Sequence, residues 1–357
     1  MTPGRVLLVA GGTGGHVLPA IAFGGWIRRK HPGTEVGYVS GTRQVELEIY
    51  RASSIEPMTV EIEGSPIGAP RGRRIKRWAS IIRSFVTAGR LLKKFNPDLC
   101  VLFGGYVSAT SLILCRARGI RAVVHEQNAR AGRITRLASR LGVPVASGWE
   151  ACAPLRRADF TPVGVPIRSL RLTERDEAWR TLGLPEPRPS GPVAAVLTGS
   201  LGSSRMRDII ENLANREDFQ DWSFIVSDPG ASAPEKKLHN LTLLPARWDI
   251  APVYSAADML IARAGASTLS EACAMGIPSV VIPWGGAADD HQTENARMME
   301  GRENIAIWPE DRDRMDELAQ KLHDYKFLRR APRSEAVEKM YNVAESICEG
   351  LWSFAAS

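Results

Sequence analysis

The stretch LLVAGGTGGHVLPA, residues 7–20, decides how the chain begins to fold. A short apolar run breaks into glycines at positions 11–15, meets His16 and continues with the pattern of a helix. Glycines at such a turn let backbone N–H groups crowd around a diphosphate at the positive end of a helix, because no Cβ is in the way. The spacing is not G-x-G-x-x-G, which disfavours a nicotinamide cofactor. A tight turn without a ligand is the alternative, and His16 at the helix start favours a substrate site.

Short apolar runs alternate with amphipathic segments along the rest of the chain, which is typical of parallel sheets covered on both faces. The expected strands are 6–10, 36–40, 99–103, 122–124 and 143–146, then 193–197, 223–226, 241–244, 259–262, 279–282 and 305–307. Each series opens with a strand that runs into a glycine turn, at 11–15 and at 199–202. We therefore expect two doubly wound, Rossmann-like α/β domains facing each other across a cleft, with ligands outside the carboxyl ends of the strands.

Composition narrows the class of protein. The 357 residues are 44% hydrophobic, and the five cysteines are widely separated without a C-x-x-C pair, which fits a reduced compartment and disfavours structural zinc. No run of about 18 uncharged apolar residues and no signal peptide is visible, so we expect a cytoplasmic protein. The net charge of +7 favours anionic partners.

Polar side chains follow several expected strands. FGGYVSA at 103–109 and HEQNARAG at 125–132 place glycines and four successive polar residues at strand ends, where the alternative is a hydrogen-bonded loop that braces the sheet. In ARAGASTLSEACAMGIP, residues 262–278, Thr268 at a helix start suits phosphate and Glu271 suits a ribose, although Glu271 in a capping box is an equal alternative. The cluster DDHQTENA at 289–296 suits sugar hydroxyls.

The basic charge is concentrated between residues 71 and 94, a stretch without any acidic residue. Ile75, Trp78, Ile82 and Phe85 recur there at helical spacing, which predicts a membrane-surface helix that meets anionic head groups. The alternative is an ordinary covering helix with a solvated basic face. Nucleic acid is not expected, since no recognised binding module accompanies the segment.

Five motifs, in this order between residues 11 and 296, resemble the MurG family: GGTGGH, GGYVS, HEQNA-x-x-G, RAGAST-x-SE and DDHQT-x-NA. That family transfers N-acetylglucosamine from its UDP derivative to lipid I and so forms lipid II in peptidoglycan synthesis. The resemblance implies a GT-B fold with an acceptor-binding, membrane-associating domain at 1–164, a UDP-sugar domain at 165–335 and a helical segment at 336–357 that packs back on the first domain. It also implies action as a peripheral protein on the cytoplasmic face of the cell membrane.

The resemblance carries over to individual positions. The acceptor diphosphate and the reaction centre would be lined by Gly12, Thr13, Gly14, Gly15, Gly104, Gly105, Tyr106, His125 and Asn128. His16 is the first candidate for the general base and Glu126 the second. The donor would be held by Arg168 and Ser200 near its diphosphate, by the backbone around Ile250 at the uracil, and by Thr268, Glu271, His291, Gln292 and Asn295 at the phosphate, ribose and sugar. No D-x-D motif stands at a strand end, which favours metal-independent, inverting chemistry without a cofactor.

Three positions depart from the family's pattern and leave the exact sugar and acceptor open. The family usually has asparagine at the positions of Thr135 and Val165 and glutamine at that of Leu201. A related transferase acting on another glycolipid or a natural product is therefore one alternative. A UDP-sugar epimerase is a second alternative, but it would have no need for the basic apolar segment. A non-catalytic nucleotide-sugar sensor at the membrane is a third, but it would leave the acceptor-side polar loops without a function.

Overall fold

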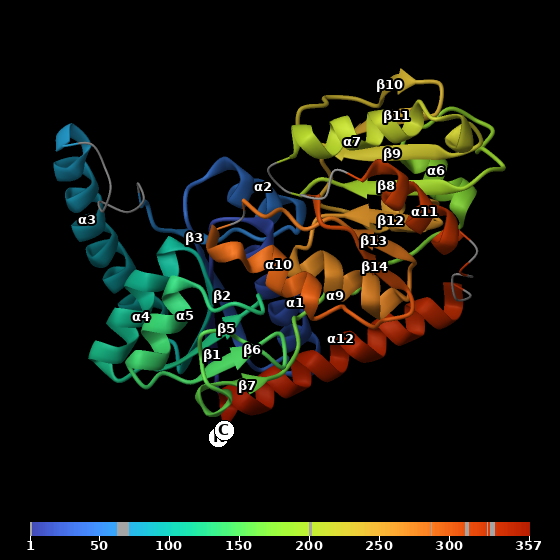
Figure 1. Cartoon of the computed structure of the whole chain (residues 1–357). Helices are drawn as coiled ribbons and strands as arrows, with labels where there is room; N and C mark the ends of the chain where they lie inside the picture. The colour runs from blue at the N-terminus through green and yellow to red at the C-terminus, as the bar shows by residue number, and fades with distance from the viewer. Residues whose placement is uncertain are drawn as a thin grey trace. The chain divides into compact units, whose positions relative to one another are not determined.

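The computed structural model describes residues 2–62, 71–199, 202–286, 288–310, 314–326, 328 and 333–357. The chain forms two compact units, each built on its own sheet (Figure 1). The first contains Met1–Arg168 and Ala344–Ser357, and the second contains Ser169–Val343. The boundary after Arg168 falls four residues later than the expected boundary at 164/165. The last segment of the chain returns to the first unit from residue 344 onward rather than from 336.

The first unit has a seven-stranded parallel sheet in the order β3-β2-β1-β4-β5-β6-β7. Its strands are β1 (Arg5–Ala10), β2 (Glu35–Ser40), β3 (Met58–Thr59), β4 (Leu99–Gly104), β5 (Arg121–Glu126), β6 (Val145–Ser147) and β7 (Thr161–Pro162). The central strands are apolar and almost fully buried, as expected of a sheet covered on both faces.

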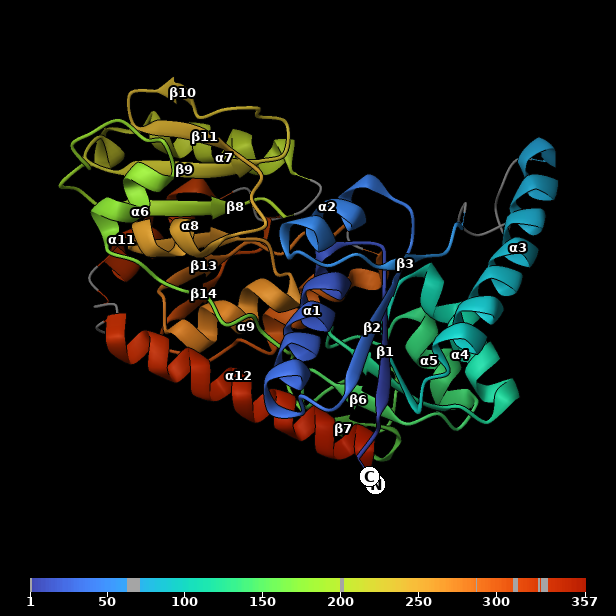
Figure 2. The ribbon, with the colours of Figure 1, turned by 180° about the vertical axis from the view of Figure 1, so that it is seen from behind.

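Helices cover both faces of this sheet. They are α1 (Gly14–Lys30), α2 (Gln44–Ala52), α3 (Arg71–Phe95), α4 (Tyr106–Arg118), α5 (Arg133–Arg140) and the short η1 (Arg157–Asp159). Figure 2 shows α1 in front of the sheet and α4 and α5 behind it. The final part of α12 (Arg333–Ala356) belongs to this unit, where the Trp352 indole stacks on the His31 imidazole with ring centroids 4.4 Å apart.

The second unit has a seven-stranded sheet in the order β10-β11-β9-β8-β12-β13-β14, in which only β10 runs antiparallel to its neighbour. Its strands are β8 (Val193–Leu197), β9 (Ser223–Asp228), β10 (Glu235–Leu238), β11 (Leu241–Pro245), β12 (Met259–Ala262), β13 (Ser279–Val281) and β14 (Ile305–Ile307). One parallel sheet and one that is parallel except for β10, each covered by helices, confirm the predicted α/β class.

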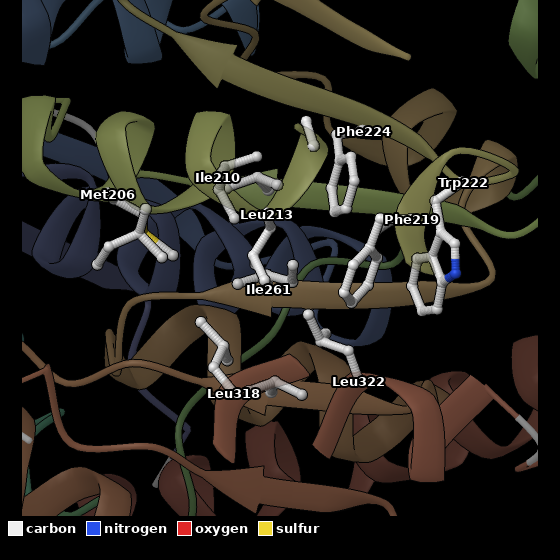
Figure 3. Close-up of a cluster of buried hydrophobic side chains, with 14 of the residues drawn as sticks. Met206, Ile210, Leu213, Phe219, Trp222, Phe224, Ile261, Leu318 and Leu322 are labelled. Atoms are coloured by element: carbon white, nitrogen blue, oxygen red, sulfur yellow. The ribbon is translucent and has the colours of Figure 1, made fainter. Parts of the chain in front are cut away.

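The helices of the second unit enclose a large apolar core. They are α6 (Arg175–Thr181), α7 (Ser204–Ala214), η2 (Glu217–Phe219), α8 (Ala251–Ala256), α9 (Ala266–Met275), η3 (Ala288–Asp290), α10 (His291–Arg297) and α11 (Met315–Lys326). Figure 3 shows side chains of α7 and α11 converging on Ile261 of β12, with Phe219, Trp222 and Phe224 closing one end of the cluster.

Both sheets change the direction of their strand order at a comparable place. In the first sheet the order reverses between β1 and β4, and in the second between β8 and β12. Open α/β sheets bind ligands outside the carboxyl ends of the strands at such a switch point. The glycine turns at 11–13 and 104–105 follow β1 and β4. Gly199 follows β8, and the turn at 263–265 follows β12.

Candidate functional site

The first candidate site is the glycine turn between β1 and α1. Gly12 has φ +98°, a conformation that favours glycine, and the backbone N–H groups of His16 and Val17 close the first helical turn on the Thr13 carbonyl at 3.1 and 3.2 Å. The N–H groups of Thr13, Gly14 and Gly15 have no protein acceptor within the described chain. Three N–H groups at the start of a 17-residue helix are a suitable site for an anionic diphosphate.

The second glycine pair packs directly against this turn. Gly104 and Gly105, with φ +112° and +82°, lead from β4 into α4, and the N–H of Gly11 donates to the Gly104 carbonyl at 3.3 Å. A Cβ on Gly105 would overlap the Gly11 carbonyl. A Cβ on Gly104 would lie 2.7 Å from Cδ2 of His16. The two loops can approach this closely only because these positions are glycine.

His16 therefore stands at the switch point of the first sheet. It is half-buried on the first turn of α1, with its ring over Gly104 and beside Gly12. Tyr106 follows Gly105 as the first residue of α4 and has 46% of its surface exposed. The Arg43 guanidinium lies 5.9 Å from its ring centroid. The structure thus brings together His16 and the glycines predicted for the acceptor site.

Glu126 has a different environment from His16. Its carboxylate is 5% exposed and accepts hydrogen bonds from the backbone N–H of Asn128 at 3.0 Å, the Asn128 side chain at 3.1 Å, the N–H of Gly132 at 2.8 Å and the Thr135 hydroxyl. Four bonds from its own loop occupy both oxygens and hold residues 126–135 in place. Of the two candidate bases, the geometry therefore favours His16. Thr135, at a position where the family usually has asparagine, supplies one of these bonds.

His125 lies inside the unit, where it is 1% exposed. Its Nε2 lies 2.9 Å from the Gly164 carbonyl and its Nδ1 lies 3.0 Å from the Gln127 amide nitrogen, which fixes the neutral tautomer with the proton on Nε2. Burial lowers the pKa of His125 from 6.5 to about 4. Because both ring nitrogens already have protein partners, this geometry supports a role in bracing the strand-end loop rather than the predicted contact with the acceptor.

In the second unit, the switch point is held by a buried arginine. Arg263, just after β12, donates to Glu310 at 2.5 Å, to the Ile282 carbonyl at 3.2 Å and to the Ser203 hydroxyl at 2.8 Å. Ser203 is the N-cap of α7, so Arg263 fixes the start of that helix. Ser200 and Leu201, predicted near the donor diphosphate, lie outside the described residues.

Glu271 lies on the second turn of α9, where it is 2% exposed. Its Oε2 accepts the hydroxyl of Tyr254 on α8 at 2.9 Å. The helix begins after Gly265, so a capping box would need its acidic residue at Thr268, and the capping interpretation of Glu271 is wrong. Thr268 is half-buried on the first turn, and Ile250 precedes α8 as its N-cap.

The polar cluster at 289–296 divides into buried and accessible members. Asn295 is fully buried and donates to the Ala264 carbonyl at 3.0 Å, so it supports the turn after β12 rather than facing a sugar. His291 and Gln292 are half-buried, and the Gln292 Oε1 accepts the backbone N–H of Trp284 at 3.0 Å. Arg168, also half-buried, is the last residue of the first unit before the division.

The basic helix α3 carries an exposed apolar row. Trp78, Ile82 and Val86, spaced four residues apart, are 54%, 64% and 48% exposed. The buried face of the helix includes Ser84, whose hydroxyl lies 3.4 Å from that of Thr110 on α4. The expectation for Phe85 differs from the structure, because Phe85 is half-buried and Val86 takes its place in the row. The side chain of Ile75 lies outside the described residues.

Sequence reasoning missed three residues that hold these turns. Glu46 accepts the Gly12 N–H, and Arg263 and Glu310 form a buried ion pair in the second unit. Glu46 and Glu310 stand outside every recognised motif, and Arg263 is the first residue of the RAGAST motif. Only a contact between segments distant in sequence reveals each function.

Within the described residues, no group of three His, Cys, Asp or Glu side chains is arranged to hold a metal ion. No helix among them has the length and apolar character needed to cross a bilayer.

Comparison with known proteins assigns the family. The model of the glycosyltransferase family 28 N-terminal domain matches residues 6–146, and that of the C-terminal domain matches residues 195–347. Two relatives described as UDP-N-acetylglucosamine–N-acetylmuramyl-(pentapeptide) pyrophosphoryl-undecaprenol N-acetylglucosamine transferase are similar over most of their length. The one from Desulforudis audaxviator is 31% identical, covering 84% of this chain and 83% of the relative. The one from Moorella thermoacetica is 30% identical, covering 87% and 86%.

Solved structures support the same fold. The crystal structure of Acinetobacter baumannii MurG matches with a TM-score of 0.65 and 22% identity over 99% of both chains. A UDP-GlcNAc 2-epimerase from Neisseria meningitidis bound to UDP-GlcNAc matches with a TM-score of 0.57 and 13% identity, covering 98% of this chain and 100% of that one. These likenesses establish the GT-B type of fold, and the sequence relatives establish the family. The chain belongs to glycosyltransferase family 28 and, within it, to the MurG family of N-acetylglucosamine transferases.

Proposed function

We propose that this chain transfers N-acetylglucosamine from UDP-N-acetylglucosamine to the 4-hydroxyl of the muramyl sugar of polyprenyl diphosphate-linked lipid I, forming lipid II with inversion at the anomeric carbon. One observation carries the proposal. The residues of the five family motifs follow β1, β4 and β5 in the first unit and β12 and β13 in the second, at the edge where open α/β sheets bind ligands.

The first unit is proposed to hold the acceptor. The N–H groups of Thr13, Gly14 and Gly15 would bind its diphosphate at the positive end of α1. His16 would take the proton from the attacking hydroxyl, because its half-buried imidazole stands beside these groups and is held by Gly104. Glu126, His125 and Asn128 would then act by fixing the loop after β5, since Glu126 bonds to Asn128, Gly132 and Thr135 and His125 bonds to Gln127 and Gly164.

The second unit is proposed to hold the donor. Thr268 and the start of α9 suit phosphate, and the Glu271 carboxylate suits the ribose hydroxyls from its position one turn further along the helix. Gln292 has its Oε1 engaged by Trp284, which leaves the amide N–H₂ to donate to the sugar. Arg168, which belongs to the first unit, would steady the charge on the leaving diphosphate. The absence of a D-x-D motif at a strand end supports chemistry without a metal ion.

We further propose that the protein acts at an anionic membrane surface on the cytoplasmic side. The exposed row of Trp78, Ile82 and Val86 lies on a helix that also exposes Arg83, Arg90, Lys93 and Lys94. An apolar row beside cations suits the boundary between head groups and acyl chains. This surface would give access to an acceptor whose polyprenyl chain stays in the bilayer.

Transfer of radiolabelled sugar tests the proposal. The protein is incubated with labelled UDP-N-acetylglucosamine and lipid I, and the products are separated by chromatography. Label in a muramyl disaccharide lipid is the expected result. Label transferred only to a different glycolipid would change the acceptor, and conversion of the sugar nucleotide without any acceptor would indicate an epimerase instead.

A further inference from the structure

Glu46 is a buried carboxylate that none of the five motifs contains. It lies on the first turn of α2 and is 3% exposed. Its Oε1 accepts the backbone N–H of Gly12 at 2.5 Å, although the two residues are 34 positions apart. Its Oε2 accepts the hydroxyl of Ser40 at 3.3 Å, at the end of β2. Gly41 packs so closely on this carboxylate that a Cβ there would overlap it.

This hydrogen bond fixes the direction of one peptide group in the first glycine turn. With φ +98° at Gly12, the N–H of that residue points inward to Glu46 and is not available to a ligand. A Cβ on Gly12 would lie 3.4 Å from Nδ1 of His16, so the same residue also borders the imidazole. Glu46, Gly12 and His16 therefore form one continuous set of contacts.

Phosphate binding does not explain a carboxylate at this place. A negative charge next to a site for a diphosphate opposes binding, and the opposition is strong where water is excluded. Helix capping does not explain it either, because both carboxylate oxygens have partners outside α2. What the carboxylate provides is a rigid acceptor for a peptide N–H, with a charge-assisted bond that is stronger than a neutral one.

We propose that Glu46 is a positioning residue for His16, which it holds through Gly12. The proposal rests on the assignment of His16 as the general base. A general base must be within hydrogen-bond reach of the proton that it removes, and a misplacement of about 1 Å can lower turnover about 100-fold. Glu46 touches neither substrate in this arrangement, so its removal should reduce kcat and leave binding of the donor unchanged.

The test uses Glu46→Gln, which keeps the size of the side chain but replaces one oxygen by an N–H₂ group. We expect kcat with lipid I to fall at least tenfold, with UDP affinity in calorimetry within twofold of wild type. The imidazole resonances of His16, assigned by comparison with His16→Ala, should shift. If Glu46→Gln does not fold, Glu46→Asp keeps the charge, shortens the arm by one methylene and should show the same separation of kcat from UDP affinity.

Two variants serve as matched controls. Ser40→Ala removes a partner of the same carboxylate without touching the glycine turn and should keep kcat within threefold. Glu48→Gln changes a carboxylate on the same helix that is bonded by Gln44 and should leave the activity unchanged.

Several outcomes would overturn the proposal. One is a kcat within twofold of wild type in both Glu46 variants, and another is a parallel loss of UDP affinity, which would indicate general damage. Equal losses in Ser40→Ala and Glu46→Gln would show that any unsatisfied carboxylate there is harmful. Failure of the assigned reaction would appear separately, as absent transfer in the wild type, and the His16 resonances would still decide whether Glu46 positions the ring.

Discussion

The imidazole of His16 lies so close to Gly104 that a Cβ on that glycine would be 2.7 Å from Cδ2 and 2.9 Å from Nε2 of the ring. Gly104 is the last residue of β4, and His16 lies at the start of α1, which follows β1. The contact therefore lies at the carboxyl ends of β1 and β4, the neighbouring strands at the switch point of the first sheet. The backbone of Gly104 thus sterically limits the rotation of the His16 ring.

Removing the imidazole tests its chemical role directly. His16→Ala should lower kcat about 100-fold, because a positioned general base contributes on that order. UDP affinity should stay within twofold of wild type, since the proposed donor residues other than Arg168 belong to the other unit. Steady-state kinetics with lipid I and calorimetry with UDP measure the two quantities. Wild-type turnover in this variant would remove His16 from the mechanism and return attention to Glu126.

A methyl group on Gly104 tests whether the close approach of this residue positions the His16 ring. Gly104→Ala strains a backbone at φ +112° and pushes the His16 ring aside, so we expect kcat to fall by about tenfold or more. The double variant with His16→Ala separates the two causes, because residues that act through one another are not additive. If Gly104→Ala reduces kcat as much in the absence of the imidazole as in its presence, the glycine serves the backbone alone.

Glu271 provides a test of the donor site. Glu271→Ala should weaken UDP binding by about 1.5–3 kcal/mol, the range for a hydrogen bond to a charged group. Tyr254→Phe is the matched control, because it removes the hydroxyl bonded to Oε2 but leaves the carboxylate in place. Calorimetry should therefore show a smaller effect for Tyr254→Phe, and equal affinities for wild type and Glu271→Ala would exclude the ribose role.

The buried His125 predicts a specific dependence of stability on pH. Its pKa of about 4 in the folded state lies below the ordinary 6.5, so the unfolded chain binds a proton between these values while the folded chain does not. The free energy of unfolding should fall by up to about 3 kcal/mol as the pH drops through that window. Urea midpoints for the transition that exposes β5 measure it, and His125→Asn should lack this component. An equal decline in the variant would assign the dependence to other groups.

The sequence was sufficient to predict the glycine turns but not the side chains that hydrogen-bond to them. Glycines between an apolar run and a helical pattern are local signals, so glycine turns could be predicted after the first strand of each series. Glu46 lies in QVELEIYRA, where it looks like an acidic residue that simply favours a helix start, and its bond to Gly12 exists only after β1 and β2 pair. Asn295 was likewise predicted to face a sugar, but the folded chain turns it to the Ala264 carbonyl.

The register of the apolar row on α3 shows the same limit. Residues at spacings of three and four share one face of a helix, so Phe85 and Val86 were equally compatible with a row that begins at Trp78. The packing of α3 on α4 through Ser84 and Thr110 decides which side of that face is covered. Packing against α4, which the sequence pattern of α3 alone does not indicate, leaves Val86 exposed and Phe85 half-buried.

This exposed row gives the test of membrane association. Replacing Trp78, Ile82 and Val86 by Ser should release the protein from anionic vesicles at moderate salt, because the apolar contacts and the basic residues, each worth about 1 kcal/mol near the surface, are both needed. Transfer to a long-chain lipid acceptor should slow, while transfer to a soluble short-chain analogue should continue, since the residues around His16 are unchanged.

Tyr341→Ser, which changes a side chain that is 44% exposed on the second unit, is the control for loss of exposed apolar surface in general. Co-sedimentation with vesicles, measured beside both transfer assays, decides the matter: if the triple variant binds as well as wild type, α3 is an ordinary covering helix and the membrane surface must be sought elsewhere.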